Sequence, residues 1–394
     1  MTPGSMPLAT EIFQEGLIIP PLKLITKGQR NEDCLRLILA NVRTPDERRG
    51  DLDAQTAANL KGIERLRDSV RRYGLEKIER YAAAIQDYTE RFLRKTLQRI
   101  PDGVYRFEDR MDNDGITETP VRIAVTITIQ KDRAVIDFGA SDPQVAGGIN
   151  ANRAVTTSAV LYVFRSLVEE EIPFNTGLMR PLTIRIPEGC VVNAVFPAAT
   201  AAGNVETSQR IVDVVLGAIH QAVPGRIPAA SSGTMNNVTF GGVNPVDGKA
   251  FAYYETIGGG MGAGASSPGM SGVHTHMTNS LNTPLEALER YLPLRIRRYS
   301  LRRNSGGTGL FRGGDGIIRE YEFLVPTRVS VMSERRNYPP YGLDGGSPGK
   351  KGKNTLITLE RKHKLGSKFN RLVQPGDVLR IETPGGGGYG RKKK

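Results

Sequence analysis

Two helical patterns dominate the first hundred residues. Apolar residues recur at helical spacing from Asp51 to about Tyr73, and Gly74 follows where a C-cap glycine belongs. A second run with the same spacing extends from Ile78 to Phe92. Together the two patterns predict a helical hairpin near the N-terminus.

A long alternation of apolar and less apolar residues follows these helices. It runs over residues 121–129, and a tight turn at 131–132 leads into a second short strand at 134–138. The alternation predicts a β-hairpin with one buried face. A loop rich in Gly, Asp and Asn then precedes a mostly apolar helix at 154–168.

The start of that helix is a candidate anion site. Its free backbone N–H groups and the positive end of its dipole lie beside Asn150 and Asn152, where an oxyanion could bind. In the simpler interpretation, Asn150 or Asn152 caps the helix. The sequence alone favours the cap.

The remaining pattern is one further helix and many short strands. The helix covers 207–222, and His220 lies near its C-terminal end, where the dipole favours a cation, so we interpret His220 as structural. Strands are expected at 231–242 and 250–257, with more strands and turns beyond. These elements predict a mixed α/β (α+β) protein with extended mixed β-sheets, packed helices and an N-terminal helical hairpin, not a simple doubly wound fold.

We expect three regions along the chain. Residues 1–100 form a connecting segment and the helical hairpin, residues 101–290 a central α/β region with the candidate site, and residues 291–394 a β-rich region with a Gly-rich tail. The composition of that tail, residues 383–390, is typical of a flexible linker.

Charge and cysteine usage narrow the possible partners. The net charge of +13 invites a nucleic-acid interpretation, but aromatic residues make up only 6%, Trp is absent, and no nucleic-acid-binding motif accompanies the charge. Solvated faces and contacts to an acidic partner are therefore favoured over a nucleic-acid site. Cys34 and Cys190 stand apart, so a disulfide framework is not expected and a cytoplasmic location fits best. No apolar run approaches the roughly 20 residues that span a bilayer, and no secretion signal is recognisable.

Two of the four histidines, His274 and His276, stand one residue apart. If the stretch is extended, both imidazoles point to the same face, where they could hold part of a metal shell or shuttle a proton. The alternative is that backbone carbonyls satisfy both rings. Thr283 and Pro284 follow as a predicted helix cap and first helical position, with Glu286 in the first turn.

The glycines at 258–264 follow an expected strand without the features of a phosphate-binding loop. No Lys and Ser/Thr follow them directly, and the next residues do not favour a helix. The better account is that the backbone there approaches either another strand or a ligand closely. Glu255, at the rim of this loop, is a candidate acid or base, with a surface glutamate as the alternative.

Several stretches occur in an order that carries a family resemblance. They are Pro3-Gly-Ser-Met-Pro7, Glu11-Ile-Phe-Gln-Glu-Gly16, Asn31-Glu-Asp33, Leu39-Ala-Asn-Val-Arg43, Asp137-Phe-Gly with Gln144 and Asn150, Gly258-Gly-Gly-Met-Gly262, His274-Thr-His-Met-Thr-Asn279, Arg302-Arg-Asn-Ser-Gly-Gly-Thr-Gly309 and Thr383-Pro-Gly-Gly-Gly-Gly-Tyr-Gly390. Over essentially its whole length, the chain resembles the hydantoinase B / 5-oxoprolinase family.

The resemblance implies a division of labour. A companion hydantoinase A-type subunit with an actin-like ATPase fold uses ATP to phosphorylate a lactam or ketone oxygen, and the present type of subunit completes ring opening or carboxylation. A lactam carbonyl is a poor electrophile, so phosphorylation lowers the barrier before water attacks. The second subunit then needs a base, donors for the developing charge and a site shielded from solvent.

On this resemblance, His274 and His276 are the first catalytic candidates, as base or as ligands of a divalent metal whose identity is unknown, and Asn279 positions substrate. Glu255 and Asp137 are further acid/base candidates. A last group would hold an oxyanion, namely Asn150 and the glycines Gly258, Gly259 and Gly260.

Relatives in the family carry an upstream part with a Gly-Gly-Thr-His and a His-His-Ala-Asp type of segment that resemble metal ligands. We expect that part either to be supplied as a separate N-terminal fragment or to be lost together with the metal site. The surface on which it would pack should be apolar.

Three functions remain open. The first is ATP-dependent hydrolysis of a cyclic amide such as a hydantoin or 5-oxoproline, with the ATPase partner. The second is a metal-dependent subunit of a ketone carboxylase, and the third is a truncated, non-catalytic scaffold for the ATPase.

Overall fold

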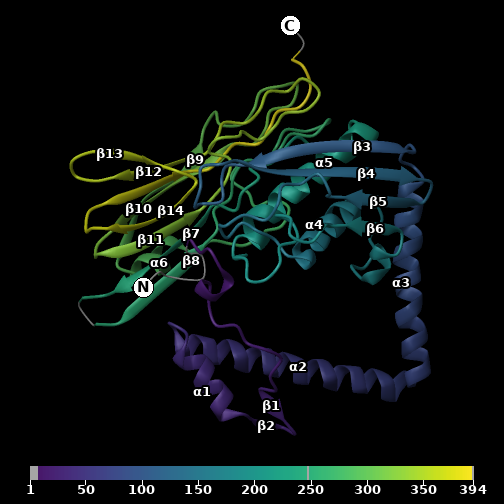
Figure 1. Cartoon of the computed structure of the whole chain (residues 1–394), viewed down its shortest axis with the longest axis horizontal. Coiled ribbons are helices and arrows are strands. Elements are labelled where there is room, and N and C mark those ends of the chain that lie inside the picture. Colours follow the sequence, from purple (N-terminus) through teal and green to yellow (C-terminus); the bar gives the residue numbers. More distant parts are fainter. Residues whose placement is uncertain (1–7, 246–247, 393–394) are drawn as a thin grey trace.

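The computed structural model describes residues 8–245 and 248–392 of the chain, so the Pro3–Pro7 stretch lies outside the described residues. The first element, η1 (Ile12–Gln14), lies against the body, where the N–H of Ile12 donates a 2.9 Å hydrogen bond to the carbonyl of Pro197. The next elements form an arm that extends away from the body (Figure 1), namely β1 (Ile25–Thr26), β2 (Gln29–Arg30), α1 (Glu32–Ala40) and α2 (Pro45–Tyr73). None of the 29 residues of α2 is buried.

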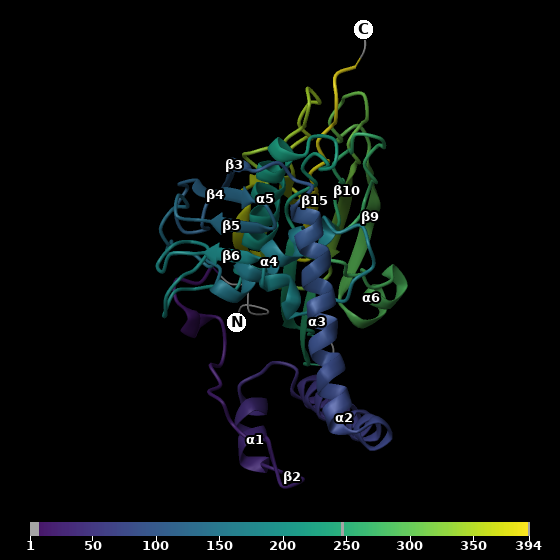
Figure 2. The ribbon, with the colours of Figure 1, turned by 90° about the vertical axis from the view of Figure 1, so that its right-hand side faces the viewer.

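Helix α3 (Leu75–Leu97) follows α2 after Gly74 alone. Gly74 has φ +81°, a conformation that favours glycine, and its N–H donates to the carbonyl of Val70. Both views show that α3 returns to the body of the protein while α2 does not (Figures 1 and 2). The two predicted helices are therefore present, but they meet at a corner and do not pack as a hairpin, because one residue is too short a loop for antiparallel packing.

The first half of the body is a four-stranded sheet covered by helices. Its strands occur in the order β3 (Gly103–Met111), β4 (Val121–Gln130), β5 (Arg133–Asp137) and β6 (Leu182–Arg185), with β5 and β6 parallel. Helix α5 (Ser208–Ala222) packs on β3 and β4, helix α4 (Arg153–Ser166) packs against α5, and a π-helical turn (Gly203–Thr207) precedes α5. Alternating β4 residues such as Ile123, Val125 and Ile127 are buried, which confirms the predicted hairpin strand.

The second half of the body is a pair of antiparallel sheets with their own core, which includes Phe240, Tyr321 and Ile381. One sheet has the order β13 (Lys362–Leu365), β12 (Lys353–Ile357), β15 (Val378–Glu382), β10 (Gly316–Phe323), β9 (Leu294–Arg302). The other has the order β14 (Lys368–Val373), β11 (Thr327–Met332), β7 (Asn237–Val243), β8 (Ala250–Glu255). This core starts at Val238, so the boundary expected near residue 290 divides one packed unit.

Helix α6 (Leu285–Tyr291) connects β8 to β9, and its cap differs from the expected one. Pro284 occupies the N-cap position, with no side-chain cap bond. Thr283 instead forms a 2.9 Å hydrogen bond with the hydroxyl of Tyr253. The threonine is therefore used to anchor the loop to β8, because its hydroxyl points at the sheet.

Glycine-rich segments form a separate layer at the end of the body that leads to the C-terminus, which we call the glycine layer: residues 258–264, 305–314, 341–349 and 383–390 (Figure 1). Their backbones pack directly against one another. A Cβ atom on Gly262 would lie 1.7 Å from the carbonyl oxygen of Ala229, and one on Gly386 would lie 2.0 Å from that of Met261. The close partner expected for residues 258–264 is thus other backbone, and the tail at 383–390 is buried rather than a linker.

The mixed α/β (α+β) class with extended mixed sheets and packed helices is confirmed. Among the described residues, no helix combines the length and apolar character that crossing a membrane requires.

Candidate functional site

The histidine stretch begins where the chain leaves the glycine layer. Val273 and Gly259 exchange two backbone hydrogen bonds of 2.9 and 3.0 Å, and His274 follows directly. The chain then turns, because His276 has φ +60°. The extended conformation assumed from the sequence therefore ends at His276.

Helices α4 and α5 hold this stretch from the opposite side. The Nδ1 atom of His276 lies 3.3 Å from the hydroxyl of Tyr162 on α4, and the two rings meet edge to face with centroids 5.9 Å apart. The side-chain amide of Gln209 on α5 donates a 3.1 Å hydrogen bond to the carbonyl of Thr275. The two histidines thus sit at the junction of the two halves of the body.

Both histidines line one cavity of about 400 Å³. Its other walls include Tyr162, Ser231 and Arg226. His274 also lines a second cavity of about 380 Å³, which it shares with Gly258, Asn282 and Tyr299. The structure therefore brings His274 and His276 to the same space, although not through the extended conformation assumed from their spacing, and places His274 between two recesses.

Burial favours the uncharged form of both rings. Desolvation lowers the pKa of His274, and the negative charge of Glu255 partly opposes that shift. Desolvation also lowers the pKa of His276, against an opposing contribution from Asp213. A neutral imidazole is the form that accepts a proton or binds a metal, so both side chains are available for either role near pH 7.

A metal ion would find part of a ligand set here. The Nε2 atom of His274 is buried without a hydrogen-bond partner in the described structure. Yet no group of three or more His, Cys, Asp or Glu side chains suited to a metal occurs within residues 8–245 and 248–392. These residues thus offer two imidazoles and no third ligand of these types beside them.

Glu255 is close to the site but is already bound. It is 5% exposed, and Arg319 donates to its two oxygens at 2.8 and 3.1 Å. The hydroxyls of Tyr321 and Tyr253 and the amide of Asn282 also donate to it. With five donors on one carboxylate, Glu255 is neither the surface glutamate of the alternative nor a free base; it holds the wall of the second cavity.

Two further predicted residues lie outside the cavities. Asn279 is exposed and lines neither of them; the nearby amide that does is Asn282. Asp137, at the end of β5, accepts a hydrogen bond from the N–H of Gly139 and lies 3.9 Å from Arg185. The structure therefore does not bring Asp137 to the histidines, because β5 belongs to the four-stranded sheet β3-β4-β5-β6, whereas the histidines lie on the loop that follows the glycine segment 258–264.

The expected oxyanion group is used for folding. The amide of Asn150 donates to the carbonyls of Val145, Gly147 and Ala199, and Asn152 provides the cap of α4 through the N–H of Val155. The N–H of Gly259 donates to Val273, and that of Gly260 donates to Pro384. These N–H groups are therefore not available to a ligand, whereas Gly258 lines the second cavity.

Sequence reasoning missed a polar face on α5 and the turn before it. Glu206, Gln209 and Asp213 are 0–1% exposed and follow one another at spacings of three and four residues. The signal was present, since polar residues at this spacing within an apolar helix share one side. Gln209 reaches the histidine stretch, and its Oε1 atom has no partner among the described residues.

Glu206 is the most perturbed carboxyl group of this face. Its Oε1 atom accepts hydrogen bonds from the N–H of Met235 and the amide of Asn237, while Oε2 is buried without a partner in the described structure. Burial, reinforced by the negative charge of Glu334, raises the pKa of Glu206 to about 8. Glu206 is thus held as a neutral acid below that pH.

Known proteins resemble the chain over nearly its whole length. The family model described as Hydantoinase B/oxoprolinase matches residues 1–392. A 5-oxoprolinase 1 of Arabidopsis thaliana is 40% identical over 418 residues, which cover 99% of this chain and 32% of the relative. The chain thus spans about a third of the length of this relative.

Two bacterial proteins match a larger share of their own length. A putative D-/L-hydantoinase subunit of Pseudomonas sp. (strain NS671) is 31% identical, with 99% of this chain and 68% of the relative covered. The crystal structure of an ATP-dependent caprolactamase from Pseudomonas jessenii superposes with a TM-score of 0.89 at 29% identity, covering 99% of this chain and 70% of the other. The resemblance inferred from the sequence motifs is confirmed: the chain belongs to the Hydantoinase B/oxoprolinase family.

Proposed function

We propose that this chain forms the ring-opening part of an ATP-dependent cyclic amide hydrolase. In this proposal a partner ATPase subunit phosphorylates the amide oxygen, and the activated ring enters the cavity lined by His274 and His276. The observation that carries the proposal is the pairing of two partly desolvated imidazoles on one cavity. A relative named as a subunit of a hydantoinase supports a multi-subunit enzyme.

In the proposed mechanism an imidazole first accepts a proton and then donates it. One neutral imidazole takes a proton from water as the water oxygen bonds to the activated amide carbon. As the carbon–nitrogen bond breaks, the imidazolium returns this proton to the lactam nitrogen, and the hydroxyl group formed from water loses its own proton to become the carbonyl of an acyl phosphate. Attack by a second water releases the phosphoryl group as phosphate.

The other cavity residues would position and shield these groups. The hydroxyl of Tyr162 beside His276 fixes the orientation of that ring. Arg226, on the cavity wall, is paired with Glu169 at 3.0 Å and would exchange that partner to contact the phosphoryl oxygens. If a divalent ion binds, His274 and His276 would be its ligands from this chain, and the ion would polarise an oxygen atom bound to it.

The test is an activity screen of the complex. The chain is co-expressed with its ATPase subunit, and ATP hydrolysis is measured with 5-oxoproline, hydantoins, and ketones with bicarbonate. In an active complex, His276→Ala should lower ring opening by about 10²-fold to 10⁴-fold, whereas His363→Ala, on β13, should not change it. Full activity of His276→Ala would remove that residue from the mechanism, and bicarbonate consumption with a ketone would replace hydrolysis by carboxylation.

The pH profile gives a second check. Because the pKa values of both histidines are lowered, the base form persists below the pH at which an ordinary histidine gains its proton. The acid limb of kcat/KM should therefore lie below pH 6.5, the ordinary value of a free imidazole. An acid limb above that value would contradict the assignment of a buried histidine as base.

A further inference from the structure

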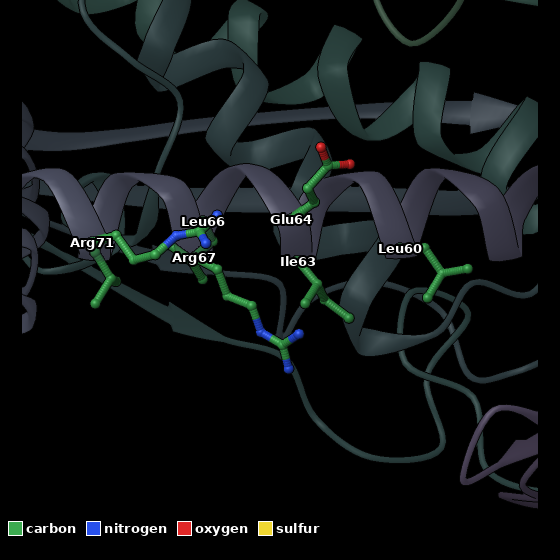
Figure 3. Close-up of a pocket in the computed structure, with 7 residues that line it drawn as sticks. Leu60, Ile63, Glu64, Leu66, Arg67 and Arg71 are labelled. Carbon is green, nitrogen blue, oxygen red and sulfur yellow. The ribbon is translucent and has the colours of Figure 1, made fainter.

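Helix α2 exposes an apolar stripe along its length. Leu60, Ile63 and Leu66 have exposed fractions of 63%, 47% and 58%. Ile63 and Arg67 project from the side of the helix opposite Glu64 (Figure 3). No residue of α2 is buried, so these large apolar side chains have no core of the described chain to pack into. Such a face is typical of an interface.

The spacing of this stripe is that of a coiled coil. Residues repeat at alternating intervals of four and three, which is the spacing of the a and d positions of a heptad. The residues with this spacing, which we call the seam, are Leu52, Thr56, Asn59, Ile63, Leu66, Val70 and Tyr73. Three heptads of this kind are suited to one long helix packed alongside.

Asn59 is the most polar residue of this seam. A single asparagine at such a position lowers the stability of a coiled coil but selects one register and one orientation. The next residue, Leu60, widens the apolar stripe on the flank of Asn59. The pattern is therefore that of a specific, moderately stable pair of helices.

The charges along α2 identify the partner. Residues 46–53 contain four carboxylates and two arginines, whereas residues 61–72 contain five basic side chains and two carboxylates. The acidic half thus stands at one end of the helix and the basic half at the other. Two copies of α2 packed antiparallel would place each acidic half against the basic half of the other copy, and a parallel pair would place like charges together.

One antiparallel register satisfies both the spacing of the seam and the distribution of charge along α2. When Ile63 faces Asn59 of the second copy, Thr56 faces Leu66 and Val70 faces Leu52. The two copies of Leu60 then meet at the two-fold axis, beside the polar position.

The same register also pairs opposite charges on the flank of the seam. It brings Asp53 to Arg67 of the other copy, twice by symmetry. Asp53 also contacts Arg30 of its own chain, which leaves it 47% exposed for the second contact.

We propose that α2 is a dimerisation arm that pairs antiparallel with α2 of a second copy of this chain. The pairing is independent of the proposed reaction. It covers the apolar stripe of both copies in a single two-fold interface. It also gives a function to the corner at Gly74, which carries α2 clear of the body so that it can meet its counterpart.

The first experiment measures association of the full chain. Sedimentation equilibrium should show a dimer whose dissociation constant rises at least tenfold in Ile63→Glu. The matched control is Ile85→Glu, because Ile85 on α3 is also 47% exposed but lies off the stripe. A chain that remains monomeric at all concentrations would overturn the proposal. So would a dimer that Ile63→Glu leaves intact, or an effect of Ile63→Glu confined to binding of an ATPase subunit.

The second experiment fixes the direction of pairing. Spin labels are placed at Lys61 or Arg72 in a Cys34→Ser background, since Cys190 is buried. In the antiparallel pair, residue 61 lies at the two-fold axis. Two labels at position 72 are therefore farther apart along the helix axis than two labels at position 61, by roughly 30 Å at about 1.5 Å per residue. Equal distances at the two positions would indicate a parallel pair and would overturn the proposal.

Discussion

The glycine layer and helix α2 are held by opposite kinds of interaction. In the layer the backbone itself is buried, and the N–H of Gly387 donates to the carbonyl of Ala230, far away in the chain. In α2 the backbone hydrogen bonds are local and no residue is buried. The layer therefore depends on the whole body, whereas α2 depends on its own helical propensity and on what packs against it.

The two regions differ in the side chains that define them and in what those side chains contact. Small residues in the layer allow its segments to approach until their backbones touch, which fixes the glycine segment that leads to His274. Large residues on α2 remain outside the core, where they are available to another molecule. The site thus rests on the most constrained part of the chain, and the arm on one of the least constrained.

The largest effect is expected from a methyl group inside the layer. In Gly262→Ala the new Cβ would lie 1.7 Å from the carbonyl oxygen of Ala229, and two backbone segments would have to separate. We expect a loss of several kcal/mol, comparable with the whole stability of a typical domain of about 5–15 kcal/mol. Thermal unfolding and soluble yield measure this effect.

Gly264→Ala is the matched control in the same segment. A Cβ on Gly264 would meet no atom closer than 3.7 Å, so its unfolding temperature should stay near that of the parent protein. If Gly262→Ala and Gly264→Ala melt at the same temperature, the layer is not close-packed.

Local patterns predicted the elements well and their assembly less well. The alternation at 121–129 gave a strand and the periodicities at 51–73 and 78–92 gave helices, because each depends on neighbouring residues. The glycine layer could not be predicted as a unit, since its four segments meet only through contacts distant in the sequence. The corner at Gly74 was missed because one glycine can end a helix in more than one way.

The site was predicted in part for the same reason. His274 and His276 share a cavity, since residues so close along the chain have few ways to separate. The surroundings of Glu255 depend on Arg319, a residue on another strand whose approach no local pattern reveals. Gln209 could have been found from the polar face that it shares with Glu206 and Asp213.

A smaller effect is expected in the pH dependence of the free energy of unfolding, to which a buried carboxyl group of the body contributes and the exposed arm does not. The folded pKa of Glu206 is about 8 against an ordinary value of 4.5, so the folded state keeps a proton that the unfolded state loses between these values. Its contribution to stability is therefore complete below pH 4.5 and is lost as the pH rises to about 8, at up to about 1.4 kcal/mol per pH unit. Glu206→Gln should remove this loss.

Denaturant unfolding at several pH values between 5 and 8 measures the difference from the parent protein. Glu334, whose pKa burial also raises, contributes in the same direction in both proteins, and because its charge interacts with Glu206, the comparison reports the titration of the pair. Glu64→Gln on the exposed arm is the control, and its curve should run parallel to that of the parent. Parallel curves for Glu206→Gln as well would show that Glu206 is ionised in the folded protein.

The smallest effect is expected in α2, where it should remain local. Gly50 lies inside the helix with no atom within 4 Å of an added Cβ. Gly50→Ala should therefore stabilise the helix by up to about 1 kcal/mol through backbone entropy alone. Because α2 has no buried residue to connect it with the body, hydrogen exchange should slow within residues 45–73 at low protein concentration, while the melting temperature of the body stays unchanged. A matching rise in the melting temperature of the body would show that the arm and the body unfold together, and the contrast between the two regions would be wrong.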